Sequence, residues 1–283
     1  MVQQTIYSRR LQAEPSKVPF YAFASVSADS GASDWLRFTS AATELPDSDF
    51  INGLRFRLGQ SVSLLPRPLL PTRCQAHASC SQIYSPGHEF VCDTANGGVC
   101  ARHNQLRDCI ASMVSSCGFP VVKEMKYGQG SNCRSDVAIR KDGIDHHADI
   151  SVISIHAATK QYQRNAQAST LPQLKEKQKA SDYLEKQFPA RADQVLDVIA
   201  FTDVGQLGEK GQAFLQMVEK YAKDCGKHFV RRWWRARMGC ILVNSIRLIV
   251  QSYVKCRRRR VPELLDSHAN DDQTLAESLT SPA

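Results

Sequence analysis

Hydrophobic residues in the middle of the chain recur with two different periods. Short runs of β-branched and other apolar residues are typical of strands. They cover residues 121–125, 136–140, 148–155 and 195–202. Residues 102–117 instead place apolar side chains on one helical face, and residues 165–187 form a polar helical stretch. The pattern predicts a mixed α/β fold with the element order α-β-β-β-α-β.

Two aspartates and a lysine occur where these elements would meet. Asp136 and Asp149 stand on the second and third predicted strands, and Lys179 precedes Tyr183 by four residues in the following helix. Two carboxylates can hold a divalent cation such as Mg²⁺ or Mn²⁺ on a phosphodiester, and an ammonium group can orient or polarise the attacking water. Asp136, Asp149 and Lys179 are therefore candidate catalytic residues, with the two aspartates as metal ligands.

Simpler interpretations compete for these residues. Asp136 also suits a turn or the start of a strand, and Asp149 suits an edge strand. Asp149 lies in an otherwise apolar run, however, where a carboxylate is costly without a cation or a hydrogen-bond partner. Lys175 and Lys177 leave the catalytic lysine open, and a solvated helix face is the alternative for the whole lysine run. Glu124 is a candidate third acid, or a surface residue at a strand end.

Cysteine and histidine residues cluster before the first helix, in the pattern Cys74-x5-Cys80-x7-His88-x3-Cys92. Thiolates and an imidazole at such short intervals can close a tetrahedral Zn²⁺ site, which would fold a segment poor in apolar residues. The fourth ligand is open between Cys74 and His77. Unrelated loop cysteines are the alternative to a metal site.

Positive charge is concentrated near the C-terminus. Residues 226–262 hold eleven Lys or Arg and no acid, in a chain of net charge +8. Such charge favours phosphate binding, and Trp233 and Trp234 beside it can stack on unpaired bases. The candidate nucleic-acid contacts are Arg231, Arg232, Arg235, Arg257, Arg258, Arg259 and Arg260. In the alternative interpretation, one helical face of this segment packs on the core. That face consists of Leu242, Ile246, Ile249 and Tyr253.

Targeting signals are few. The N-terminus has no apolar core of signal-peptide length, so the ten cysteines are expected as reduced thiols and metal ligands in the nucleus or cytoplasm, not in a secreted protein. The longest apolar stretch, residues 238–250, is interrupted by Asn244 and Arg247 and is too short to span a membrane. Arg257 to Arg260 would also suit a nuclear import signal.

The order of the motifs resembles a known family. The motifs are Arg102-His103-Asn104-x-Leu106-Arg107-Asp108, Gly118, Glu124, Arg134-Ser135-Asp136-Val137, Asp149-Ile150-Ser151-Val152 and Lys179-x-x-x-Tyr183. They resemble the PD-(D/E)XK restriction-like endonuclease region at the end of the polyprotein of non-LTR retrotransposons. Upstream and downstream segments, including Asp34-Trp35-Leu36 and Thr202-x-x-Gly205-x-x-Gly208, extend the resemblance over most of the chain.

The resemblance implies a restriction-endonuclease-like core preceded by a small zinc knuckle, with Cys80, His88 and Cys92 matching the zinc pattern. It implies a metal-dependent DNA endonuclease that nicks target DNA to prime reverse transcription. Its partners would be DNA, the RNA of the element and a separate reverse transcriptase. His103 is interpreted as packing beside the knuckle, and His146 and His147 as turn residues.

The predicted organisation has five parts. They are a helical linker with a disordered start (1–72), the knuckle (73–101), the endonuclease core (102–225), a basic helical extension (226–260) and a disordered acidic tail (261–283).

Two departures from the family pattern leave a second function open. Ser135 stands where the family has proline, and Ser151 stands where the compact motif has lysine. No Tyr-x-Asp-Asp polymerase signature is present either. The main competitor is therefore a catalytically degenerate, zinc-containing nucleic-acid-binding module. An interaction protein of the same fold is a third interpretation.

Overall fold

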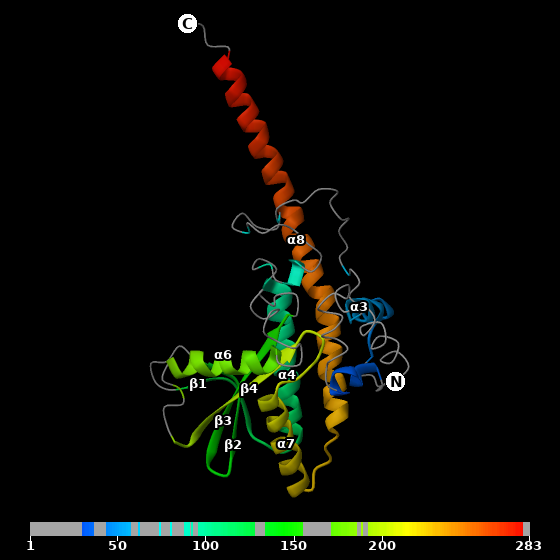
Figure 1. Cartoon of the computed structure of the whole chain (residues 1–283), viewed down its shortest axis with the longest axis vertical. Helices are drawn as coiled ribbons and strands as arrows, with labels where there is room; N and C mark the ends of the chain where they lie inside the picture. The colour runs from blue at the N-terminus through cyan, green and yellow to red at the C-terminus, as the bar shows by residue number, and fades with distance from the viewer. Residues whose placement is uncertain are drawn as a thin grey trace, which may run out of the picture.

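The computed structural model (Figure 1) describes residues 30–36, 44–57, 62, 74, 80, 88–90, 92, 96–127, 134–154, 171–185, 188 and 192–279. For Ser30, Asn96 and residues 257–279 only the backbone is described. His77, the alternative fourth zinc ligand, lies outside the described residues. The structure therefore describes only Cys74 of the two candidates.

A four-stranded mixed sheet forms the centre of the molecule, in the order β1-β2-β3-β4. The strands are β1 (Val121–Lys126), β2 (Arg134–Lys141), β3 (Ile144–Ile153) and β4 (Gln194–Thr202). β1, β2 and β3 are antiparallel neighbours, whereas β4 runs parallel to β3. A parallel pair needs a long crossover connection, and helix α6 (Leu171–Glu185) lies in it.

The β2–β3 hairpin turns at two residues with left-handed backbones. Asp142 has φ 50° and Gly143 has φ 81°, which is the pattern of a two-residue type I′ turn. Because the turn ends at Gly143, β3 begins at Ile144, before the residue expected from the sequence. His146 and His147 are therefore strand residues, and their interpretation as turn residues is wrong.

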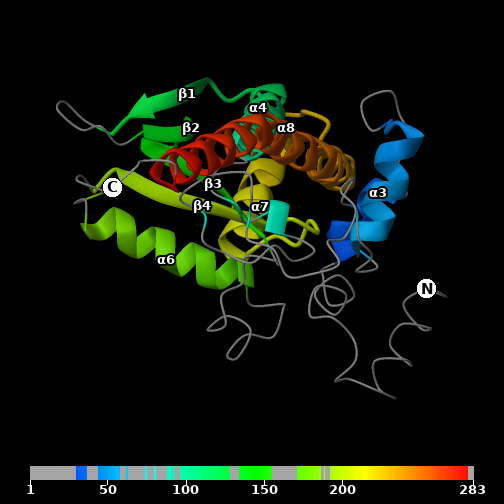
Figure 2. The same ribbon diagram turned by 90° about the horizontal axis from the view of Figure 1, so that it is seen from above.

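Helices cover both faces of the sheet. Helix α4 (Asn96–Ser116) and helix α7 (Glu209–Asp224) share one apolar core with the sheet, which includes Leu106 of α4, Ile199 of β4 and Phe214 of α7. Helix α6 covers the opposite face, where Tyr183 packs with Tyr127 and Phe188. Figure 2 shows α6 on one side of the sheet and α4 on the other.

Helix α8 (Arg231–Leu279) joins the core along its first half. Its apolar face at Leu242, Ile246, Ile249 and Tyr253 is buried, none of these side chains being more than 3% exposed. The interpretation that this face packs on the core is confirmed. The helix continues to Leu279, through the segment expected as a disordered tail, and its last part projects from the body (Figure 1).

Helices α4 and α8 touch through their backbones. A Cβ atom added to Gly98 of α4 would lie 2.6 Å from Cα of Ile249 in α8. Any side chain larger than hydrogen would force the two helices apart at this point.

Two N-terminal elements also pack on α8. They are the 3-10 helix η2 (Ser30–Leu36) and helix α3 (Asp47–Arg57). Trp35 of η2 packs with Val243, and Arg247 bonds Asp49 of α3 at 2.9 Å. These described parts of the expected linker therefore belong to the folded body.

The element order α-β-β-β-α-β is confirmed by α4, β1, β2, β3, α6 and β4. No helix in the described part of the chain is long and apolar enough to cross a membrane.

Candidate active site and metal centre

The two predicted catalytic aspartates lie across from each other on neighbouring strands. Val137 of β2 pairs with Ala148 of β3 in antiparallel register, so Asp136, the residue before Val137, stands opposite Asp149, the residue after Ala148. Oδ2 of Asp136 accepts a hydrogen bond of 2.6 Å from the backbone N–H of Ile150, the residue after Asp149. The hairpin therefore brings both carboxylates to one level of the sheet.

Asp149 is held from helix α6. Its side chain is 8% exposed, and Tyr183 donates a hydrogen bond of 2.6 Å to Oδ1. The Lys179 ammonium lies 3.4 Å from Oδ1 and 3.2 Å from Oδ2. Oδ2 is buried without a hydrogen-bond partner, so its approach to Lys179 is an ion pair outside hydrogen-bond geometry. Burial, followed by the charge of Asp149, raises the pKa of Tyr183, which keeps the phenol protonated as a donor.

The choice among the three lysines favours Lys179. Lys177 is exposed, whereas Lys175 is partly buried one turn before Lys179. Burial, and then the charge of Lys179, lowers the pKa of Lys175. Lys179 forms the ion pair with Asp149, whereas the charge of Asp149 only opposes the lowering of the Lys175 pKa.

Asp136 is held from helix α4 by a residue that the sequence interpretation assigned elsewhere. Nε2 of His103 lies 3.0 Å from Oδ1 of Asp136. The hydrogen bond to Asp136 raises the pKa of His103 above its ordinary value, against burial, and Asp149 adds to the increase. His103 therefore belongs to the acidic site, and its interpretation as packing beside the knuckle is wrong. His103 precedes Arg107 by four residues, so both lie on one face of α4, and Arg107 pairs with Glu124 of the sheet. This spacing could have indicated from the sequence that His103 also faces the sheet.

Glu124 lies in the same row of the sheet but is bound differently. Lys123 pairs with Val137, so the following register position sets Glu124 against Asp136. Glu124 has a left-handed backbone with φ 54°, which interrupts the ladder there. Its carboxylate is half-exposed and pairs with Arg107 and, at 3.6 Å, with Arg134. The structure does not bring Glu124 into contact with either aspartate.

Ser135, the residue before Asp136, is fully buried. Its hydroxyl lies 3.2 Å from Nδ1 of His147 and 3.3 Å from the carbonyl oxygen of Met125. His147 packs edge-on against Tyr127 and Phe188 beneath α6. A buried hydroxyl with two partners thus anchors the start of β2, next to Asp136.

A second group of residues with metal-binding side chains comes from the part of the chain before α4. Ligand atoms of Cys74, Cys80, His88 and Cys92 all lie within 4.8 Å of one another, and the group can hold a metal ion such as zinc. In the part of the chain that the structure describes, it is the only set of three or more His, Cys, Asp or Glu side chains arranged in this way. Cys74 thus supplies a fourth donor to the cluster, the ligand that the sequence left open.

The spacing of these atoms suits a tetrahedral metal. Sγ of Cys74 and Sγ of Cys92 are 3.7 Å apart, and Sγ of Cys80 lies 3.5 Å from Nε2 of His88. Ordinary zinc bond lengths in a tetrahedron separate two sulfurs by about 3.8 Å and a sulfur from a nitrogen by about 3.6 Å. A disulfide needs a separation of about 2.05 Å, so the cysteines are not oxidised partners.

The cysteine cluster rests on α8. The hydroxyl of Tyr253 lies 3.3 Å from Sγ of Cys74, and the Tyr253 ring meets the His88 ring edge-on. Burial lowers the pKa of His88, which favours the neutral imidazole that a metal requires.

The predicted nucleic-acid contacts on α8 divide into three groups. Arg235 is buried and donates a hydrogen bond of 3.0 Å to the carbonyl of Gly205, so its prediction as a nucleic-acid contact is wrong. Arg231 pairs with Glu219 of α7, and Arg232 is exposed. Arg257 to Arg260 lie in α8, but their side chains are outside the described residues. The apolar pattern of α8 explains the burial of Arg235, which lies beside Trp234 on the core side.

No protein-family model matches the chain, and no curated protein matches it. The chemistry of the site is therefore the basis for assigning a function.

Proposed function

We propose that the protein is a divalent-metal-dependent DNA endonuclease of the restriction-like class. The observation that carries the proposal is the meeting of Asp136, Asp149 and Lys179. These residues come from β2, β3 and α6, and they are the residues that the sequence motifs single out. Two carboxylates with an adjacent ammonium match the needs of phosphodiester hydrolysis.

The donor set suits Mg²⁺ or Mn²⁺. Oδ2 of Asp149 is a buried anionic oxygen that accepts no hydrogen bond and has the Lys179 ammonium 3.2 Å away, so it keeps lone pairs for a metal ion. Oxygen ligands are those that Mg²⁺ and Mn²⁺ prefer. Asp136 and Asp149 would hold the ion, and the remaining coordination positions would fall to water and phosphate oxygens. When bound, the ion would stabilise negative charge on the phosphate and lower the pKa of a bound water.

The protein's own groups have separate tasks in this proposal. Tyr183 and His103 fix the orientation of Asp149 and Asp136 by direct contacts at 2.6 and 3.0 Å. Lys179 would orient the attacking water and partly neutralise Asp149. Arg107 and Arg134, both at Glu124 on the neighbouring strand, supply positive charge for flanking phosphates.

The wider role rests on the motif resemblance. A restriction-like endonuclease of a non-LTR retrotransposon would nick target DNA and expose a 3′ hydroxyl that primes reverse transcription. The element RNA and a separate reverse transcriptase would be its partners. Zn²⁺ in the cysteine cluster would have a structural task, since all four donors are protein side chains and no position is left for substrate.

A second function is favoured by one specific observation. Lys179 and Tyr183 already occupy much of the Asp149 carboxylate, and Glu124 is bound by arginines. A degenerate remnant with these contacts would bind nucleic acid through its basic surface without turnover. Binding and cleavage must therefore be measured separately.

The decisive experiment is nicking of supercoiled plasmid with Mg²⁺ or Mn²⁺. We expect Asp136→Asn and Asp149→Asn each to abolish nicking, because either change removes a charged ligand, while DNA affinity changes little. Lys177→Gln is the matched control, since Lys177 is an exposed lysine of the same helix. Full nicking by either aspartate variant would overturn the assignment. Tight DNA binding with no nicking by the natural chain would establish the binding module instead.

A further inference from the structure

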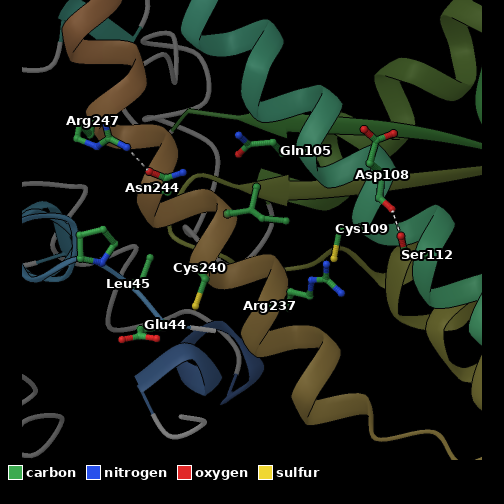
Figure 3. A pocket seen from close by; sticks show the side chains of 12 residues that line it. Glu44, Leu45, Gln105, Asp108, Cys109, Ser112, Arg237, Cys240, Asn244 and Arg247 are labelled. Carbon is green, nitrogen blue, oxygen red and sulfur yellow. Dashed lines mark hydrogen bonds between the residues drawn. The ribbon is translucent and has the colours of Figure 1, made fainter. Parts of the chain in front are cut away.

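A groove lies between α4 and α8, away from the aspartates. Its volume is about 500 Å³, within the usual range of small-ligand sites. Figure 3 shows Gln105, Asp108 and Ser112 approaching it from α4, opposite Arg237 and Asn244 of α8. Gln105 follows His103 by two residues, so it projects from roughly the opposite side of α4. The groove and the acidic site therefore lie on different sides of the same helix.

One unpaired positive charge faces this groove. The guanidinium of Arg237 lies 5.6 Å from the ring centroids of both Trp233 and Trp234, which hold it in place by cation–π contacts. Within the described part of the chain, Arg237 has no ion-pair partner, whereas Arg247 pairs with Asp49 at 2.9 Å. Asp108 at the rim pairs with Lys123 and Arg107. Arg237 is thus available for an anionic ligand.

Two carboxamides lie on opposite walls. Gln105 comes from α4 and Asn244 from α8 (Figure 3). Oδ1 of Asn244 accepts a hydrogen bond of 2.9 Å from Arg247, which leaves its amide nitrogen as a donor toward a ligand. Exposed Gln105 offers both a donor and an acceptor. Paired carboxamides of this kind recognise the edges of nucleobases.

The floor of the groove is neutral. Burial raises the pKa of Cys109 to about 12 and that of Cys240 to about 11. Both side chains therefore remain uncharged thiols at neutral pH and behave as small apolar groups. The lining also includes Arg247, which is paired with Asp49, and the exposed carboxylate of Glu44. Uncharged thiols between polar walls, with the Arg237 guanidinium beside them, suit a planar ring that carries a phosphate.

We propose that the groove between α4 and α8 binds one unpaired nucleotide of a single-stranded nucleic acid. Arg237 contacts its phosphate, and Gln105 and Asn244 contact the edge of its base. The choice of nucleic acid rests on the proposed function, but binding in the groove does not require cleavage.

A band of ion pairs lies between the groove and the acidic site. Asp108 at the groove's rim contacts Lys123 of β1 and Arg107, and Arg107 also contacts Glu124. These contacts run over the exposed side of α4 between the two sites. A strand with its scissile phosphate near Asp136 would have to cross these ion pairs to place a flanking nucleotide in the groove.

The test uses binding of single-stranded oligonucleotides by fluorescence anisotropy. The full chain with Asp149→Asn is used, with zinc present and magnesium absent, so that no cleavage interferes. Arg237→Gln should weaken binding about tenfold and make the salt dependence shallower by about 0.7. Lys223→Gln removes an equal charge from an exposed position on α7, outside the proposed contacts, and is the matched control. Equal effects of the two substitutions would overturn the proposal.

A second variant tests recognition of the base. Gln105 is exposed, so Gln105→Ala should leave the fold intact. The unsubstituted groove should prefer a normal oligonucleotide to an abasic one with the same phosphates, and Gln105→Ala should reduce this preference several-fold. An unchanged preference would contradict base contact in the groove.

The two proposals fail separately. If the aspartate variants lose nicking but Arg237→Gln binds normally, only the groove is rejected. If the aspartate variants keep nicking but Arg237→Gln binds weakly, only the nuclease is rejected.

Discussion

The Asp149 carboxylate accepts a hydrogen bond on one oxygen and has the Lys179 ammonium 3.2 Å from the other. Oδ1 receives the Tyr183 hydroxyl at 2.6 Å, whereas Oδ2 is buried without a hydrogen-bond partner. A carboxylate in this state is oriented by the protein before any ligand arrives. Orientation in advance reduces the cost of assembling a reactive geometry. The Tyr183 hydroxyl is therefore expected to serve both stability and activity.

Replacement of Tyr183 tests this expectation. Tyr183→Phe keeps the ring among Tyr127 and Phe188 but removes the donor to a buried charge. We expect a loss of about 1.5–3 kcal/mol in the free energy of unfolding, measured with urea. Leu184→Ala, on the exposed side of α6, is the control and should cost much less. Equal stability of Tyr183→Phe and the natural chain would show that the hydrogen bond contributes little.

At the scale of elements, α6 is tied to α7 as well as to the sheet. Gly208 at the start of α7 provides no side-chain cap. Glu176 of α6 supplies the missing acceptor, because its carboxylate receives the N–H of Gly211 at 3.2 Å. Glu176 precedes Lys179 by three residues, about one turn of α6, so this contact helps to hold the lysine beside Asp149.

Glu176 also makes stability depend on pH. Burial raises its pKa above the ordinary 4.5, against the opposing effect of the Gly211 N–H. The folded state therefore holds this proton more tightly than the unfolded state does, so the contribution to stability is complete at low pH and is lost as pH rises through the raised pKa. Glu176→Gln, which is neutral throughout, should gain stability relative to the natural chain as pH rises above that value. Urea unfolding at several pH values measures the difference, and parallel curves would contradict the prediction.

Most elements could be predicted from the sequence, because apolar periodicity sets them directly. The two-residue β2–β3 turn, which is shorter than the sequence pattern predicts, sets the register that places Asp136 opposite Asp149. His103 and Arg235 were assigned wrongly for a shared reason. Both are polar residues on helices whose rotation about the axis depends on tertiary packing. Periodicity identifies the apolar face but does not reveal which acid or carbonyl a flanking polar side chain will reach.

At the scale of the whole molecule, the cysteine cluster connects residues that precede α4 in the chain to α8. Cys74 and His88 both contact Tyr253, the last large buried residue along that helix in the described part of the chain. A metal bound by the four side chains would hold this segment against the body. Metal affinity would then appear as folding stability.

Removal of the metal tests this arrangement. The purified protein should carry about one zinc per chain, and Cys92→Ser should lose it and expose residues 73–101 to protease. Cys100→Ser is the control, since Cys100 is an exposed cysteine outside the cluster. Elemental analysis combined with limited proteolysis gives both readouts. Folded protein without zinc would contradict the proposed metal.

The backbone contact between Gly98 and Ile249 has a thermodynamic consequence. His103, which holds Asp136, follows Gly98 by five residues on α4, and Tyr253, which meets the cysteine cluster, follows Ile249 by four on α8. A shift of one helix must move the other where their backbones touch. Occupancy of the cysteine cluster and cation affinity at the aspartates would therefore share a coupling free energy, and by reciprocity each metal would change the affinity for the other by the same factor.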